Sequence, residues 1–140
     1  MVAHSHTELV AWKLADELRR EVYDLFSDGP PSRDFRLRSQ AEDAASSICR
    51  NLSEGFYLFS PPQFAKFARY AAGSIGELAS VIEDGVAKQH WTKERVNRAE
   101  NLVKRTGTAV GRLQRYLRSP RARRNAARIL QKNSGAEPEP

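Results

Sequence analysis

Arginines recur every three or four residues along the last third of the chain. This spacing puts side chains on neighbouring turns of a helix, where they can form a slowly winding stripe. The guanidinium group is planar, stays charged and can contact a phosphate through two hydrogen bonds. We therefore predict a surface that binds the phosphate backbone of a nucleic acid, either RNA or DNA. Its candidate residues are Arg105, Arg112, Arg115, Arg118, Arg121, Arg123, Arg124, Arg128 and Lys132.

The positive charge is concentrated in the same segment. Residues 93–132 carry 13 Lys/Arg and 2 Asp/Glu, a net charge of +11, whereas residues 1–92 carry 10 Lys/Arg and 13 Asp/Glu, a net charge of −3. This asymmetry favours an anionic partner. A solvated face that keeps an oligomer in solution is the alternative interpretation. No aromatic residue follows Tyr116, so stacking on bases is not indicated.

The residue types that enzymes use are present but not arranged for catalysis. Di-iron sites in helical bundles need Glu-x-x-His pairs, and no glutamate here has a histidine three residues later. Cys49 has Arg50 beside it, which favours the thiolate, but a lone helical cysteine is more often a small buried apolar residue. A single cysteine excludes an internal disulfide and fits a reducing cytoplasm. We expect no enzymatic activity, no metal and no cofactor.

Apolar residues recur with helical spacing in four long segments, over residues 7–27, 35–54, 61–88 and 93–117. Thr7, Ser60 and Thr92 stand where N-caps belong, and Gly55 stands where a glycine ends a helix. The segments predict an all-α fold, an up-down-up-down antiparallel four-helix bundle with a short basic C-terminal helix. We expect one domain over residues 1–119, a basic segment over 120–132 whose helix starts at Arg121, and a disordered tail over 133–140.

The predicted corner between the second and third helices is unusually apolar. Four large apolar residues follow one another between Gly55 and Ser60, and the third helix carries a single charge, Glu77, between Tyr70 and Ile82. A surface of this kind is typical of an interface. We predict that it contacts other copies of the chain or a partner protein. The candidate residues are Phe56, Tyr57, Leu58, Phe59, Tyr70 and Ile75.

Polar residues also recur on these two helices. We interpret them as a structural hydrogen-bond network that joins the two helices, and contact with a ligand or nucleic acid is the alternative. Its predicted members are Asn51, Glu54, Ser74 and Glu77. We interpret the glycines of the third and fourth helices, which are Gly73, Gly76, Gly107 and Gly111, as positions of close helix contact.

The same stretch carries a family resemblance. Its patterns are Ser-Ile-x-x-Asn-Leu-x-Glu-Gly from Ser47, Ser-x-x-x-Phe-x-x-Phe from Ser60, and Ala-x-Gly-Ser-x-x-Glu-Leu from Ala71. They resemble the four-helix-bundle proteins encoded in 23S rRNA intervening sequences, over roughly residues 8–117. The family is similar, more distantly, to the accessory variability determinant Avd of diversity-generating retroelements. Avd is a pentameric bundle that binds nucleic acid and reverse transcriptase.

The resemblance implies a homopentamer, a nucleic-acid partner and a reverse transcriptase as a candidate protein partner. The chain departs from the family where Ala41, Glu42 and Asp43 follow Gln40, because family members often have basic residues there. It also departs at the corner, where aromatic and aliphatic residues replace the family's basic ones. If family members bind nucleic acid through these positions, this chain does so differently.

These observations lead to one predicted function and one alternative. The prediction is a cytoplasmic, non-enzymatic, homo-oligomeric accessory or scaffold protein that binds nucleic acid through its C-terminal arginines. The alternative is a protein–protein interaction module, for example a partner of a reverse transcriptase, that does not bind nucleic acid directly. No apolar run approaches the ~20 residues that a membrane-spanning helix needs, and the first residues have no signal-peptide pattern, so we expect no membrane contact.

Overall fold

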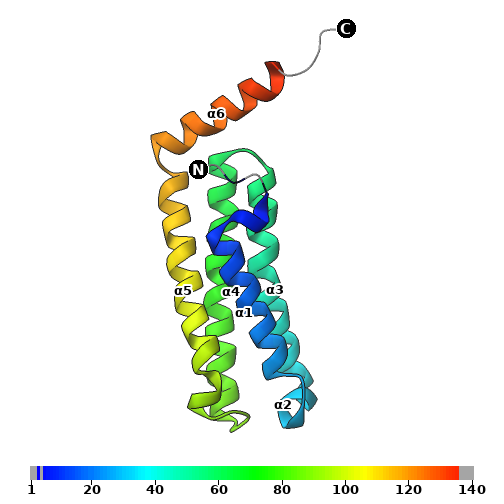
Figure 1. Ribbon diagram of the computed structural model, residues 1–140. Helices are drawn as coiled ribbons and strands as arrows, with labels where there is room; N and C mark the ends of the chain where they lie inside the picture. The colour runs from blue at the N-terminus through cyan, green and yellow to red at the C-terminus, as the bar shows by residue number, and fades with distance from the viewer. Residues whose placement is uncertain (1–2, 4, 136–140) are drawn as a thin grey trace.

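The computed structural model describes residue 3 and residues 5–135, and the regular structure in this part of the chain is entirely helical (Figure 1). The elements are the 3-10 helix η1 (His6–Glu8) and the α-helices α1 (Val10–Leu25), α2 (Gly29–Arg33), α3 (Phe35–Tyr57), α4 (Pro61–Ala87), α5 (Lys93–Leu117) and α6 (Pro120–Gly135). The all-α prediction is confirmed. Residues 133–135, predicted to belong to the tail, are helical, and the rest of that tail lies outside the described residues.

Four long helices pack antiparallel as a helical bundle around one core. α3 lies against α1 and α4, and α5 lies against the same two helices, so the four enclose a common interior (Figure 1). The apolar residues that recur with helical spacing along α3 are buried, and among them Ala41, Ala44 and Ala45 let neighbouring helices approach closely. On α5, Leu102 and the polar Thr106 are buried. Thr106 donates its hydroxyl proton to the Leu102 carbonyl oxygen at 2.6 Å, so burial leaves it paired.

The helix starts show which local signals are reliable. Ser60 accepts a hydrogen bond from the Gln63 amide at 3.5 Å, and Thr92 accepts one from the Arg95 amide at 3.1 Å, so both predicted N-caps are confirmed. Thr7 is not a cap, because α1 starts only at Val10 and Thr7 lies inside η1.

The segment after α1, predicted only as a break, forms the short helix α2. Gly29 has a φ of +67°, a left-handed conformation that glycine adopts without strain. Pro30 and Pro31 then occupy the first turn of the helix, where the missing amide proton of proline costs no hydrogen bond. A helix of one turn is too short to produce a periodic apolar pattern.

Gly55 does not end α3, contrary to the prediction. The helix continues to Tyr57, and the left-handed residue at the corner is Phe59, with a φ of 52°. Gly55 is instead needed for packing, because a Cβ atom there would lie 2.5 Å from Cδ1 of Phe64. The glycine thus allows the first turn of α4 to approach the last turns of α3.

One end of the bundle, which we call the closed end, comprises residues 25–34 and 85–98. The Trp91 indole donates a hydrogen bond to the Leu25 carbonyl oxygen at 2.9 Å, and its ring packs edge-on against Phe26, with centroids 4.9 Å apart. A Cβ atom on Gly85 would collide with the Trp91 ring. The closed end is therefore filled to the point where no methyl group can be added at Gly85.

A polar cluster fastens the surface of the closed end. Asp34 caps α3 by accepting a hydrogen bond from the Leu37 amide at 3.3 Å. Its second carboxylate oxygen lies 2.8 Å from Nε2 of His90 and 3.0 Å from Nζ of Lys88. The hydrogen bonds from His90 and Lys88 lower the pKa of Asp34 to about 2. The cluster links the start of α3 to the turn between α4 and α5.

Cys49 is buried in the core at the α3 face. Burial raises the pKa of its thiol to about 11, so the thiolate that Arg50 was suggested to favour does not form near neutral pH. The interpretation of Cys49 as a small buried apolar residue is confirmed.

Candidate nucleic-acid interface

The two halves of α5 carry arginines in different surroundings. In the half that belongs to the closed end, Arg95 contacts Glu21 at 3.0 Å and Asp24 at 2.7 Å, and Arg98 contacts Glu21 at 3.4 Å. Both carboxylates come from α1, which packs beside α5. The positive charges of Arg95 and Arg98 are therefore balanced by carboxylates of the same protomer.

The arginines of the other half of α5 and of α6 have no such partners among the described residues. All eight predicted phosphate-binding arginines are exposed, and none forms an ion pair within the described part of the chain: Arg105, Arg112, Arg115, Arg118, Arg121, Arg123, Arg124 and Arg128. Arg118 only donates a hydrogen bond from Nε to the Gln114 carbonyl oxygen at 3.3 Å. Lys132 belongs to α6, but its side chain is not described.

α6 leaves the end of α5 at Ser119 and crosses over the end of the bundle near the α3–α4 corner (Figure 1). α6 is attached to the bundle through the buried Ala122 and through Asn125. Asn125 donates a hydrogen bond from Nδ2 to the Tyr116 hydroxyl oxygen at 2.9 Å. The direction of the chain therefore changes between Arg118 and Arg121. The arginines form two adjacent groups on helices at an angle, and the single continuous stripe suggested by their spacing is not what the structure contains.

We call this end of the molecule, residues 56–64 and 112–129, the open end. Tyr57, Leu58 and Phe59 are 49%, 42% and 47% exposed there, and Tyr70 on α4 is 44% exposed. Phe56 is half-buried against the core. Ile75, predicted as an interface residue, faces the core of its own bundle, so the structure removes it from the exposed surface.

Tyr57 already has a partner within the chain. Its hydroxyl oxygen lies 3.0 Å from Nδ1 of His6, and the His6 ring packs edge-on against Trp12, with centroids 5.0 Å apart. These contacts hold η1 against the end of α3. Sequence reasoning missed them because nothing local relates residue 6 to residue 57.

The polar network between α3 and α4 is centred on Ser47, a residue that we did not predict to belong to it. The Ser47 hydroxyl oxygen accepts hydrogen bonds from Ser74 at 2.9 Å and from Asn51 at 3.0 Å. Two of the predicted members are thus joined across the helices. Glu54 and Glu77 are exposed, and the described part of the chain gives them no hydrogen bond or ion pair. They are not part of the network.

The predicted close-contact glycines are also placed differently. A Cβ atom on Gly73, Gly76, Gly107 or Gly111 would meet nothing within 4 Å in the described protomer. The glycines of close approach are Gly55 and Gly85, each facing an aromatic ring. Which glycine faces a ring depends on the packing of two helices, and a spacing rule along one helix does not contain that information.

A family model described as 23S rRNA-intervening sequence protein matches residues 7–111, three quarters of the chain. The chain belongs to the 23S rRNA-intervening sequence protein family. This confirms the resemblance seen at the α3–α4 corner. A comparison with curated proteins gave no match.

The extent of the match separates the bundle from the basic end. The part that is common to 23S rRNA-intervening sequence proteins stops before Arg112, so Arg105 is the only candidate phosphate-binding residue within it. Family membership therefore supports the fold of the bundle. The role of the arginines after residue 111 has to be inferred from the structure of this chain.

The described residues contain neither a metal-binding cluster nor a membrane-spanning helix. No group of three or more His, Cys, Asp or Glu residues there is placed to hold a metal ion. None of the described helices is long and apolar enough to cross a membrane. The family's description names no enzymatic activity.

Proposed function

We propose that this chain, an up-down-up-down four-helix bundle with a basic C-terminal helix, is a non-enzymatic accessory or scaffold protein that binds the phosphate backbone of RNA or DNA. The observation that carries the proposal is the contrast along α5. Arg95 and Arg98 are neutralised by carboxylates of α1, whereas the eight arginines from Arg105 to Arg128 have no acidic partner among the described residues. Exposed guanidinium groups without a carboxylate are available to phosphates.

The form of the site favours backbone contact over base recognition. α6 has no aromatic residue among its arginines, and the hydroxyl oxygen of Tyr116 at the α5–α6 junction accepts a hydrogen bond from Asn125. Bases bound to single strands are usually stacked on exposed aromatic rings. Phosphate contacts hold a duplex or strand in place and carry no sequence information. We therefore propose binding that tolerates many sequences.

We further propose that the protomers assemble into a homo-oligomer, with five copies as the number that the family resemblance implies. The support is the half-exposed group of Tyr57, Leu58, Phe59 and Tyr70. A closed ring would repeat the arginines around its axis, so that weak contacts act together. Light scattering after gel filtration should then give about five times the 15.8 kDa protomer mass. A monomer at micromolar concentration would contradict assembly, and a dimer or tetramer would contradict only the number five.

A second candidate is a protein–protein interaction module without direct nucleic-acid binding, for example a partner of a reverse transcriptase. The same exposed corner favours it, because an apolar surface fits a protein partner as well as a second copy. In that case the arginines would only keep the assembly in solution. Salt dependence of nucleic-acid binding distinguishes the two candidates.

The test is a titration of a duplex with the full chain at several salt concentrations. Phosphate binding releases counterions, so if about six phosphates are contacted, the slope of log K against log salt should be near −5. Duplexes of unrelated sequence should bind alike. Absence of binding at ~50 mM salt, or a slope near zero, would favour the interaction module.

A further inference from the structure

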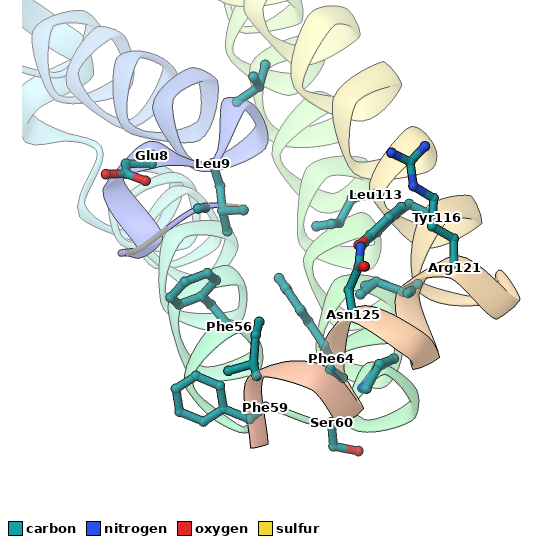
Figure 2. A pocket seen from close by; sticks show the side chains of 17 residues that line it. Glu8, Leu9, Phe56, Phe59, Ser60, Phe64, Leu113, Tyr116, Arg121 and Asn125 are labelled. Atoms are coloured by element: carbon teal, nitrogen blue, oxygen red, sulfur yellow. The ribbon is translucent and has the colours of Figure 1, made fainter. Parts of the chain in front are cut away.

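A cavity of about 630 Å³ lies at the open end, below α6. It is bounded by the start of α1, the α3–α4 corner, the last turns of α5 and the underside of α6 (Figure 2). Most of its wall is apolar, with Leu9, Phe56, Phe64 and Leu113 around the hollow. Packed interiors contain few voids larger than a water molecule, whereas ligand sites have volumes of about 300–1,000 Å³ and apolar walls.

The roof of the cavity explains why it stays open. α6 contributes Arg121, Ala122, Asn125, Ala126 and Ile129 to the wall, and the two alanines leave space beneath the helix. A helix that only needed to cover the bundle end would be expected to fill this space with larger side chains, as Trp91 fills the closed end. The corner opposite is unusual too, because Phe59 at the cavity wall has a left-handed φ of 52°, a conformation that a bulky residue adopts only under constraint.

Three polar side chains stand at the rim on the α5–α6 side. Asn125 donates to the Tyr116 hydroxyl oxygen at 2.9 Å, so the Tyr116 hydroxyl proton is left to donate elsewhere. Arg121 lies beside Tyr116, with its guanidinium group directed along α5 (Figure 2). The side chain is exposed and has no ion pair in the described part of the chain, so it can turn toward the rim. Glu8 also belongs to the wall, but its carboxylate points away from the hollow on the far side. The near rim therefore offers donors and one positive charge.

We propose that this cavity binds a free linear carboxylate, with its aliphatic chain under α6 and its carboxylate on Arg121 and Tyr116. An anionic head complements the positive rim, and an aliphatic chain fits the apolar interior. A methylene group takes about the space of one water molecule, about 30 Å³, so a chain of about twelve carbons would take roughly 360 Å³ and fit within the cavity. A partner helix fits less well, because a helix needs a groove along which it can lie, and α6 already lies across this hollow.

The test measures binding of dodecanoate to the full chain by isothermal titration calorimetry, well below micellar concentration. One molecule should bind per chain, and dodecyltrimethylammonium, which has the same tail and the opposite charge, should bind at least about tenfold more weakly. Ala126→Phe fills the cavity and should abolish binding. Ala127→Phe, on the exposed side of the same helix, is the matched control and should leave the dissociation constant unchanged.

A second pair of variants on α6 tests whether Arg121 binds the carboxylate of the ligand. Arg121→Gln should weaken dodecanoate binding about tenfold, the loss typical of one charge-assisted hydrogen bond. Arg123→Gln removes the same charge from a position outside the cavity wall and should change the affinity less than twofold. Both positions are exposed, so neither variant endangers folding. Equal binding of the two head groups, unchanged affinity in Ala126→Phe, or no binding at about 1 mM dodecanoate would each overturn the proposal, whatever the outcome with nucleic acid.

Discussion

The two ends of the bundle are completed in opposite ways. At the closed end, Trp91 fills the space between α1 and α4, and its indole is hydrogen-bonded to Leu25. Charged groups there find partners as well: Asp34 with His90 and Lys88. At the open end, α6 roofs a cavity, aromatic side chains are half-exposed, and the arginines have no carboxylate partner in the part of the chain that the structure describes.

This difference shows that residue type alone does not decide what an arginine does. Arg95 and Arg115 lie on one helix and have the same chemistry, but only Arg95 faces acidic residues of α1. The first is part of the protomer's own structure, and the second is available to a partner. The closed end can therefore stabilise the fold while the open end is available for binding.

The largest expected effect tests how tightly the closed end is packed. Gly85→Ala places a methyl group against the Trp91 ring and should lower the free energy of unfolding by about 2 kcal/mol, a typical cost of overpacking. Urea denaturation of the variant and the wild type at equal protein concentration measures this loss of stability. Gly107→Ala, where the added Cβ meets nothing within 4 Å, is the control and should raise stability by about 0.5–1 kcal/mol. Equal effects at the two positions would mean that the closed end is no more tightly packed than the surface of α5.

A second pair of variants compares the two kinds of arginine directly. Arg95→Gln leaves Glu21, which is only 11% exposed, with the more distant Arg98 alone, and should cost about 1 kcal/mol of unfolding free energy. Arg115→Gln should change it by less than about 0.5 kcal/mol, because Arg115 has no partner in the described chain. The same urea titrations apply. A larger loss from Arg115→Gln would break the distinction between paired and unpaired arginines.

The smallest effect concerns pH and the polar cluster of the closed end. The folded-state pKa of Asp34 is about 2, below its ordinary value of 3.8. Its stabilising contribution is therefore complete above pH 3.8 and is lost as the pH falls toward 2. Asp34→Asn should be less stable than the wild type near neutral pH, and the difference between their urea midpoints should shrink over that acidic window. A difference that stays constant down to pH 2 would show that the carboxylate charge is not responsible.

Local signals in the sequence predicted most of the fold. Ser60 and Thr92 identify their helix starts because an N-cap depends only on residues three positions apart. The helical spacing of apolar residues over residues 35–54 predicted α3 for a similar reason, because this spacing also relates residues that are close in the sequence. Gly55 misled the prediction, since a glycine needed for packing against Phe64 and a glycine that ends a helix look identical in a sequence.

The candidate site was predicted less completely, because it depends on what lies across from each residue. The candidate arginines of α5 and α6 were named from the sequence and are exposed, but the pairing of Arg95 with Glu21 relates residues on different helices. The hub at Ser47 likewise depends on tertiary packing, whereas the break between the bundle and the basic segment at Ser119 was predicted from the sequence. The cavity under α6 has no sequence signature, since alanines are common in any helix.

The central claim, that unpaired arginines at the open end bind phosphate, is tested most directly by two charge-matched variants. One replaces Arg115, Arg118, Arg121 and Arg124 with glutamine. The other replaces Lys13, Arg33, Arg36 and Arg50, which are also exposed and free of ion pairs in the described chain. Each removes four positive charges and takes the formal net charge from +6 to +2.

The measurement is the affinity for one duplex across a range of salt concentrations, with light scattering to check that assembly is unchanged. The open-end variant should bind about a hundredfold more weakly at ~50 mM salt, and its slope of log K against log salt should flatten from about −5 to about −2. The second variant should keep an affinity and slope close to those of the wild type. Equal losses in the two variants would show that net charge alone drives binding, and unchanged affinity in the open-end variant would contradict the account.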